Sequence, residues 1–99
     1  MERHIKNYLK FFGLDGTEFI PCECGCGRRG TDFHHLKPRS SFGSKRKEEQ
    51  DRVENVACIA RECHDKAHAS KEFNEALKGK HLKKCLKNHL NRDIEKNVI

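Results

Sequence analysis

The chain has 99 residues, of which 34% are hydrophobic and 36% are charged, and its formal net charge is +6. A chain of this length forms one small domain, and its low apolar content predicts a thin core that needs a further stabilising element. Since no apolar run approaches the roughly 20 residues that a membrane-spanning helix needs, we expect no membrane association.

Cysteine usage suggests what that stabilising element is. Six cysteines are present, and they form disulfides in an oxidising compartment or bind metal in a reducing one. The N-terminal stretch MERHIKNYLKFFG is charged and amphipathic, unlike the apolar run of a secretory signal. We therefore expect a cytoplasmic protein with thiolate metal ligands. The alternative, a disulfide-rich secreted toxin, requires a signal peptide or an export partner.

Basic residues cluster at positions 28–29, 44–47 and 78–84. Such clusters are typical of phosphate-binding surfaces, although a solvated basic face gives the same pattern. Charge alone leaves both interpretations open.

The elements predicted in the first part of the chain are a helix, a cysteine-rich turn and a β-hairpin. Residues 2–12 have apolar side chains at helical spacing, and Gly13 ends the pattern. The turn leads into a strand over residues 31–36. A mobile polar loop over 42–55 and a short apolar second strand over 56–60 are expected to follow.

Two helices are predicted in the last third of the chain. The first begins near Glu62 and ends at Lys78, with Gly79 as its stop signal. The second carries an apolar side chain every four residues, and we expect this stripe to pack on the core: Leu82, Leu86, Leu90 and Ile94. The predicted fold class is α+β.

Two sets of side chains have metal-ligand spacing. His64 and His68 lie four residues apart on a predicted helix, so both imidazoles can reach one ion, although two surface histidines give the same spacing. Two cysteine groups can together supply a tetrahedral zinc shell, with at least one thiol to spare: Cys22, Cys24 and Cys26, then Cys58 and Cys63. Structural zinc would stabilise the thin core. For Cys85 and His89, also four residues apart, packing is the favoured interpretation.

The runs DFHHLKPRS and ENVACIARECHDKAH resemble the HNH endonuclease motif of the His-Me finger (ββα-metal) nucleases, in its small zinc-knuckle form known from phages. The resemblance covers residues 22–68. It implies one HNH nuclease domain over residues 1–99, with a hairpin-plus-helix ββα-metal core, flanking helices and a structural zinc. Residues 1–21 would form an N-terminal helix and lead-in, and 69–99 a helical C-terminal extension.

The resemblance also implies roles for particular residues. His34, His64 and His68 would bind a divalent metal, His35 would be the general base, and Asn55 would organise the hairpin. Because neighbours on a strand point to opposite sides, His34 and His35 cannot readily share one ion. A backbone carbonyl, such as that of Asn55, would orient His35.

The activity implied is metal-dependent hydrolysis of DNA phosphodiester bonds, by nicking or double-strand cleavage. An all-imidazole site favours Zn²⁺, Ni²⁺ or Mn²⁺, whereas Mg²⁺ prefers oxygen ligands but is an activator in the family. Asp32 and Asp65 could add oxygen ligands through water. Basic residues near the site would contact the DNA backbone: Lys37, Arg39, Lys45, Arg46 and Lys47.

One departure from the family pattern concerns the knuckle, where Ala60 stands at the position of a second cysteine and Cys58 lies two residues earlier. Zinc would then bind across a wider loop between Cys58 and Cys63, or the structural site would be weakened or lost. A non-catalytic zinc-containing DNA-binding or adaptor module is the alternative function. The expected partners are DNA and other phage or host DNA-processing proteins, and both a monomer and a homodimer are compatible with the sequence.

Overall fold

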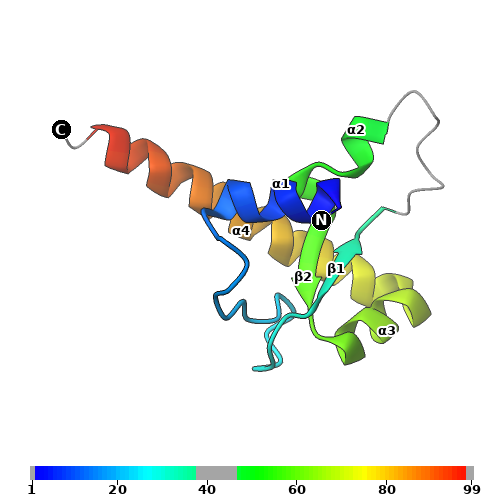
Figure 1. The fold of residues 1–99 in the computed structure, drawn as a ribbon. Helices are drawn as coiled ribbons and strands as arrows, with labels where there is room; N and C mark the ends of the chain where they lie inside the picture. The colour runs from blue at the N-terminus through cyan, green and yellow to red at the C-terminus, as the bar shows by residue number, and fades with distance from the viewer. Residues whose placement is uncertain (1, 38–46, 98–99) are drawn as a thin grey trace.

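The computed structural model describes residues 2–37 and 47–97 (Figure 1). Helices and a two-stranded antiparallel sheet are combined in one chain, which confirms the α+β class. In chain order the elements are α1 (Arg3–Phe12), β1 (Asp32–His35), α2 (Lys47–Gln50), the 3₁₀ helix η3 (Val53–Asn55), β2 (Val56–Ile59), α3 (Arg61–Ala69) and α4 (Lys71–Asn97). No helix in these described ranges has the length and apolar content to cross a membrane.

Helix α1 forms as its apolar spacing predicts and ends where expected. Gly13 has φ of 68°, a left-handed conformation that glycine adopts without a Cβ clash. The backbone N–H of Leu14 then donates to the carbonyl of Leu9. Tyr8 and Leu9 are buried, so the helix packs through this face.

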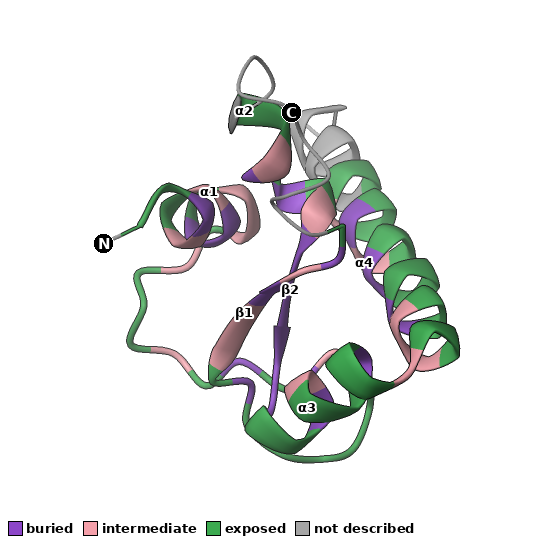
Figure 2. Ribbon diagram, turned by 90° about the vertical axis from the view of Figure 1, so that its right-hand side faces the viewer, coloured by how far each residue is buried: buried purple, intermediate pink, exposed green. Residues whose placement is uncertain are grey.

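The hairpin of β1 and β2 divides the core into two halves. The register pairs His34 with Ala57 and His35 with Val56. Since side chains alternate across a strand, Ala57 and Ile59 pack with the apolar residues of α3 and the start of α4. Val56 packs instead with α1 and the middle of α4. Strand β2 is buried along its whole length (Figure 2).

The polar segment before β2 contains short helices. Residues 42–46 of the predicted mobile loop lie outside the described residues, whereas α2 and η3 occupy most of its second half. The backbone N–H of Asn55 donates to the carbonyl of Arg52 across η3. Strand β2 begins directly after this turn.

The predicted helix boundary at Gly79 is wrong. The chain breaks at Ser70, whose extended backbone (φ −132°) ends α3 and whose hydroxyl accepts from the N–H of Phe73 at the start of α4. Gly79 lies inside α4. Glycine in a helix costs only about 1 kcal/mol, which the buried Leu77 and His81 on either side offset by packing.

The prediction that the leucine stripe faces the core is also wrong. Leu82, Leu86 and Leu90 are 42%, 59% and 51% exposed, and the side chain of Ile94 lies outside the part that the structure describes. The buried face of α4 carries Leu77, His81 and Cys85 instead. The end of α4 extends away from the hairpin (Figure 1).

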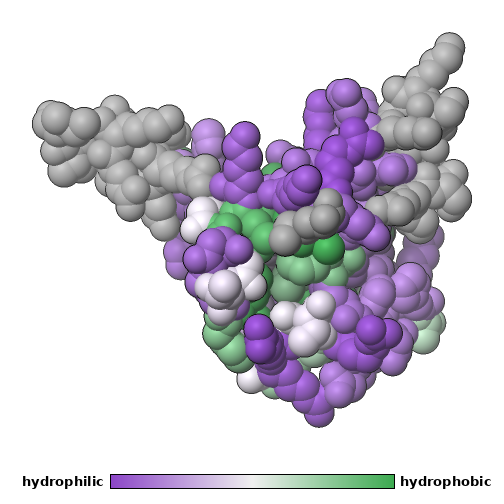
Figure 3. Space-filling view, in the orientation of Figure 1, coloured by the Kyte–Doolittle hydropathy of each residue, from purple (hydrophilic) through white to green (hydrophobic). Residues whose placement is uncertain are grey.

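Apolar surface remains on this small domain. On the face seen in Figure 3, apolar side chains gather near the centre and hydrophilic ones surround them. Four large apolar residues are exposed among the described side chains: Phe19, Leu82, Leu86 and Leu90. Part of the apolar content of the described residues therefore lies on the surface.

Candidate metal centres

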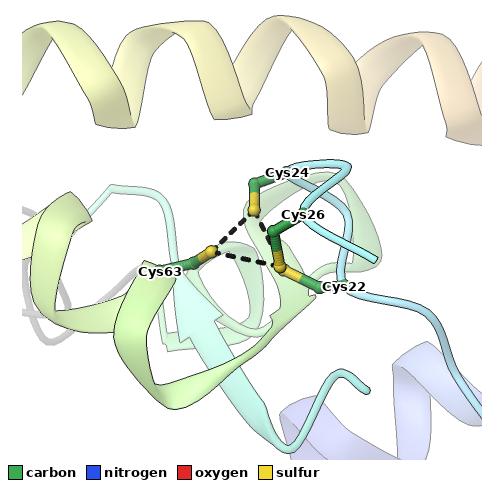
Figure 4. A group of neighbouring side chains, drawn as sticks. All are labelled: Cys22, Cys24, Cys26 and Cys63. Atoms are coloured by element: carbon green, nitrogen blue, oxygen red, sulfur yellow. Dashed lines mark hydrogen bonds between the residues drawn. The ribbon is translucent and has the colours of Figure 1, made fainter. Parts of the chain in front are cut away.

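Four cysteines converge from two parts of the chain. Cys22, Cys24 and Cys26 lie in the turn before β1, and Cys63 lies in the first turn of α3 (Figure 4). Their sulfur atoms all lie within 4.8 Å of one another. Four thiols in such a group could hold a zinc ion with tetrahedral geometry.

The backbone of the turn brings its three thiols together. Gly25 and Gly27 have φ of 83° and 82°, conformations that let the chain curl tightly between the cysteines. The N–H of Cys22 donates to the carbonyl of Arg28 across the turn. The N–H of Ala60 donates to the Cys22 sulfur at 3.2 Å, which fixes the turn against the start of α3.

The thiols differ in acidity. The backbone N–H of Arg28 lowers the pKa of the exposed Cys26 thiol to about 7. Burial raises the pKa of the Cys63 thiol well above its usual value. A bound zinc ion would have to displace the proton of Cys63, so metal binding here is expected to depend on pH.

Of the five candidate zinc ligands, Cys58 is the one outside this group. It is fully buried on the opposite face of β2, with Tyr8 and Val56. Burial, followed by the charge of Glu23, raises its pKa to about 12. A Cβ on Gly30 would lie only 2.7 Å from the Cys58 sulfur, so this contact requires glycine. Cys26 completes the fourfold group, and no wide loop from Cys58 to Cys63 is involved.

Glu23, between two of these cysteines, ties the turn to the core. Its carboxylate accepts hydrogen bonds from the Tyr8 hydroxyl and the Cys58 N–H, each at 2.7 Å, and from Nδ1 of His81. Nε2 of His81 donates to the carbonyl of Val53. His81 is fully buried, so the turn, η3 and α4 are held by one internal polar network.

A second group contains His34, His64 and His68. Ligand atoms of the three rings lie within 4.8 Å of one another, and the Nε2 atoms of His64 and His68 are 3.0 Å apart. Burial lowers the pKa of His34, and the neighbouring rings lower it further, against a hydrogen bond to Asn74 that raises it. A neutral imidazole is the form that binds metal.

Oxygen atoms orient two of these rings. Asp32 Oδ2 accepts from Nδ1 of His64 at 2.8 Å, which directs the other ring nitrogen toward the group. Asn74 Oδ1 lies 2.7 Å from Nε2 of His34, and its amide donates to the carbonyl of Leu36. Partners of this kind fix the tautomer and the orientation of metal-binding histidines. Asp32 therefore contacts a ring, whereas Asp65 is exposed.

His35 lies on the other side of the strand, as the alternation of β1 requires. Its Nε2 is 3.0 Å from Asp51 Oδ1, and Asp51 is 4% exposed. A carboxylate only accepts, so Nε2 carries a proton, and in a neutral ring the lone pair lies on Nδ1. Arg3 Nε donates to Asp51 Oδ2 at 3.1 Å, and Asn7 donates to the Asp51 carbonyl. The expected partner, a backbone carbonyl such as that of Asn55, is replaced by this carboxylate.

Asn55 joins the end of β1 to the segment before β2. Its Oδ1 accepts from the N–H of Lys37 at 2.8 Å, and its amide donates to the carbonyls of Lys37 and Gln50. Its own carbonyl accepts from the N–H of Leu36. Asn55 thus bridges the open end of the hairpin.

The group of His34, His64 and His68 and the separate His35 border one open pocket of about 400 Å³. It is lined by Glu2, His4, Phe33, His34, His35, His64 and His68. Of the basic residues expected to contact DNA, Lys37 is exposed beyond the end of β1. Arg39, Lys45 and Arg46 lie outside the described residues, as does the side chain of Lys47.

Sequence reasoning missed several residues around these groups. Asp51, Asn74 and His4 come from three segments far apart in the chain, and no spacing rule connects them to the histidines they approach. Glu23 stands out in the sequence only as an acidic residue between two candidate zinc ligands, and no spacing rule connects it to His81, which is 58 positions away.

Compared with family models, with curated proteins and with solved structures, the chain gives no match. The chemistry of the cysteine group and of the histidine group is therefore inferred from their residues alone.

Proposed function

We propose that the protein is a metal-dependent DNA endonuclease of the HNH (His-Me finger) type. The observation that carries this proposal is the shared pocket, which is bordered by the His34, His64 and His68 group and by His35 with its buried Asp51. A DNA-binding module has no need of an oriented base beside a cation site.

The order of elements supports a ββα-metal core. The hairpin is followed directly by α3, with Ala60 alone between β2 and the helix. The first strand carries His34 and His35, and α3 carries His64 and His68 on one face. In the proposed scheme the four cysteines hold a structural zinc that fastens the turn before β1 to α3. A reducing compartment such as the cytoplasm keeps those thiols available.

His35 is the general base in this scheme. Its Nδ1 accepts a proton from the attacking water while Asp51 holds Nε2–H and stabilises the imidazolium that forms. A divalent ion at His34, His64 and His68 would supply charge stabilisation at the scissile phosphate and the departing 3′ oxygen. The products would be 5′-phosphate and 3′-hydroxyl ends.

The net charge supports DNA as the proposed substrate. A formal net charge of +6 favours a polyanion, and contacts to phosphates carry little sequence information. Lys37 and the basic residues after it would bind the backbone beside the pocket. We therefore expect weak sequence preference, with nicking by a single site.

The test is cleavage of supercoiled plasmid with Mg²⁺, Mn²⁺, Ni²⁺, Zn²⁺ or EDTA. Wild type is compared with His35→Ala and His35→Asn, and with His89→Ala as a control, because His89 is an exposed histidine on α4 away from the pocket. Bound zinc and circular dichroism are measured on the same samples to show that each variant is folded.

We expect cleavage by wild type and His89→Ala only with added metal, and a loss of at least about 100-fold in both His35 variants. Folded wild type that binds DNA without cutting under any metal would refute the nuclease and favour a zinc-containing DNA-binding or adaptor module. Cleavage that survives in the His35 variants would refute the role of His35.

A further inference from the structure

A third group of metal-ligand side chains lies on the α1 side of the hairpin. His4, His35 and Asp51 come from α1, β1 and the turn after α2, and their ligand atoms lie within 4.8 Å of one another. His4 and Asp51 are 5% and 4% exposed, and the rings of His4 and His35 are 4.5 Å apart between centroids. The group is therefore assembled by the fold, and it shares no residue with the His34 group.

The donor set is chemically specific. Two imidazoles with one carboxylate are typical ligands of transition metals, whereas Mg²⁺ and Ca²⁺ prefer oxygen atoms alone. Because His4 and His35 also border the 400 Å³ pocket, an ion can reach them from solvent.

Outer contacts orient the group as in known metal sites. Glu2 Oε2 lies 3.3 Å from Nδ1 of His4, so a neutral His4 ring with its proton there carries its lone pair on Nε2. Arg3 contacts Asp51 through Oδ2, while Oδ1 is the oxygen directed at His35. The Arg3 side chain is 51% exposed, and its positive charge opposes a cation without occupying Oδ1.

We propose that His4, His35 and Asp51 form a transition-metal site that takes Zn²⁺, and that zinc bound there inhibits the nuclease. The inhibitory part rests on the proposed function, whereas the site itself does not.

The inhibition follows from the two nitrogens of His35. A neutral imidazole has one N–H, which lies on Nε2 while Asp51 accepts it. When Nε2 coordinates zinc beside Asp51 Oδ1, the ring proton moves to Nδ1. That nitrogen then cannot accept a proton from water, so an ion in this site and general-base catalysis by His35 exclude each other.

The first experiment counts metal ions in the full chain. Zn²⁺ is titrated into protein that holds zinc at the cysteines only, and binding is followed by calorimetry, native mass spectrometry and ¹⁵N NMR of the histidine rings. The variants are His4→Ala, His4→Gln, Asp51→Asn and Arg3→Gln, with His89→Ala as the control. Amide NMR spectra confirm that each variant is folded.

We expect wild type and His89→Ala to bind one zinc ion more than His4→Ala, His4→Gln and Asp51→Asn, with the ring signals of His4 and His35 shifting together. Arg3→Gln should bind this additional ion more tightly, because a competing charge is removed. Equal zinc counts in wild type and the folded His4 and Asp51 variants, or ring signals of His4 and His35 that do not shift with zinc, would overturn the site.

The second experiment measures cleavage in Mn²⁺ as Zn²⁺ rises, with each rate divided by that of the same variant without zinc. We expect the half-inhibiting zinc concentration to be at least about tenfold higher in His4→Ala than in wild type. Equal inhibition in both would overturn the inhibitory role. If zinc binds at His4, His35 and Asp51 but no metal supports cleavage, the proposed function and the inhibition fail while the site stands.

Discussion

The buried pair of Glu23 and His81 allows a quantitative prediction. Replacing His81 by leucine removes the Nδ1–H that binds Glu23 and leaves a 3% exposed carboxylate without its closest cationic partner, with Lys84 Nζ, at 3.9 Å, as the remaining cation. Breaking a buried ion pair from one side costs about 3–5 kcal/mol. Since small domains have a total stability of about 5–15 kcal/mol, His81→Leu should remove much of it.

The companion variant separates charge from packing. In Glu23→Gln/His81→Leu no buried charge remains, and the amide oxygen still accepts from the Tyr8 hydroxyl and the Cys58 N–H. The double variant should therefore lose about 2 kcal/mol less than the sum of the two single variants. His89→Leu, at an exposed position of the same helix, should change stability by less than about 0.5 kcal/mol.

The assay is urea unfolding of zinc-loaded protein at pH 6, followed by circular dichroism. A loss below about 1 kcal/mol in His81→Leu, or additive effects in the double variant, would show that the pair does not stabilise the fold. Zinc counted after each titration excludes loss of the metal as the cause.

The same pair predicts a pH dependence. Burial alone would lower the pKa of His81, but hydrogen bonds to Cys85 and Glu23 and the Glu23 charge raise it to about 10. The stabilisation that protonated His81 gives the folded state should be complete at pH values below about 6.5, the pKa of histidine in the unfolded chain. It should decline as the pH rises through 10. The other titratable groups that face this pair are Tyr8, which stacks on His81, and Lys84, which lies near Glu23. The stability difference between wild type and His81→Leu should therefore shrink from pH 6 to pH 10, whereas a constant difference would contradict the assignment.

Three further predictions use matched pairs or a single exchange. In urea unfolding, Gly30→Ala should lower the free energy of unfolding by about 1–3 kcal/mol, because the added Cβ would lie 2.7 Å from the buried Cys58 thiol. Gly79→Ala should raise it by about 0.5–1 kcal/mol, because the added Cβ meets open space and alanine favours the helix. Leu77→Ala should lower the free energy of unfolding by about 2–5 kcal/mol, whereas Leu82→Ala should lower it by less than about 1 kcal/mol, because Leu82 is 42% exposed. Equal losses would contradict the assigned buried face of α4. Asp51→Asn should lower plasmid cleavage by at least about tenfold while the cysteines keep their zinc, and unchanged cleavage would refute its orienting role.

Local signals in the sequence predicted local structure well. Gly13 predicts the end of α1, because glycine adopts the left-handed φ found there without a clash. The spacing of four residues predicts that His64 and His68 lie together on one face of a helix. The alternation of β1 predicts that His34 and His35 face opposite sides. Each of these signals lies within about four residues of the feature that it predicts.

The partners of the site residues were beyond such signals. Asp51 reaches His35 across 16 positions, and Asn74 reaches His34 across 40. The sequence also could not show which of the five candidate cysteines lies outside the zinc group. Strand β2 decides this, because it directs Cys58 into the other half of the core. Long-range contacts of this kind are fixed by the assembled fold, so spacing rules cannot supply them.

The face that α4 buries shows why hydropathy alone fails here. The stripes Leu82–Leu86–Leu90 and Leu77–His81–Cys85 have the same four-residue spacing, and the first is the more apolar. The second is buried because His81 meets the Glu23 carboxylate, which the cysteine turn holds inside the domain. Exposing His81 to bury the leucines would leave Glu23 charged and unpaired in the core, a cost of several kcal/mol that offsets the apolar area gained. A buried ion pair thus selects the orientation of the helix, and removing both charges should weaken that preference more than it weakens the fold.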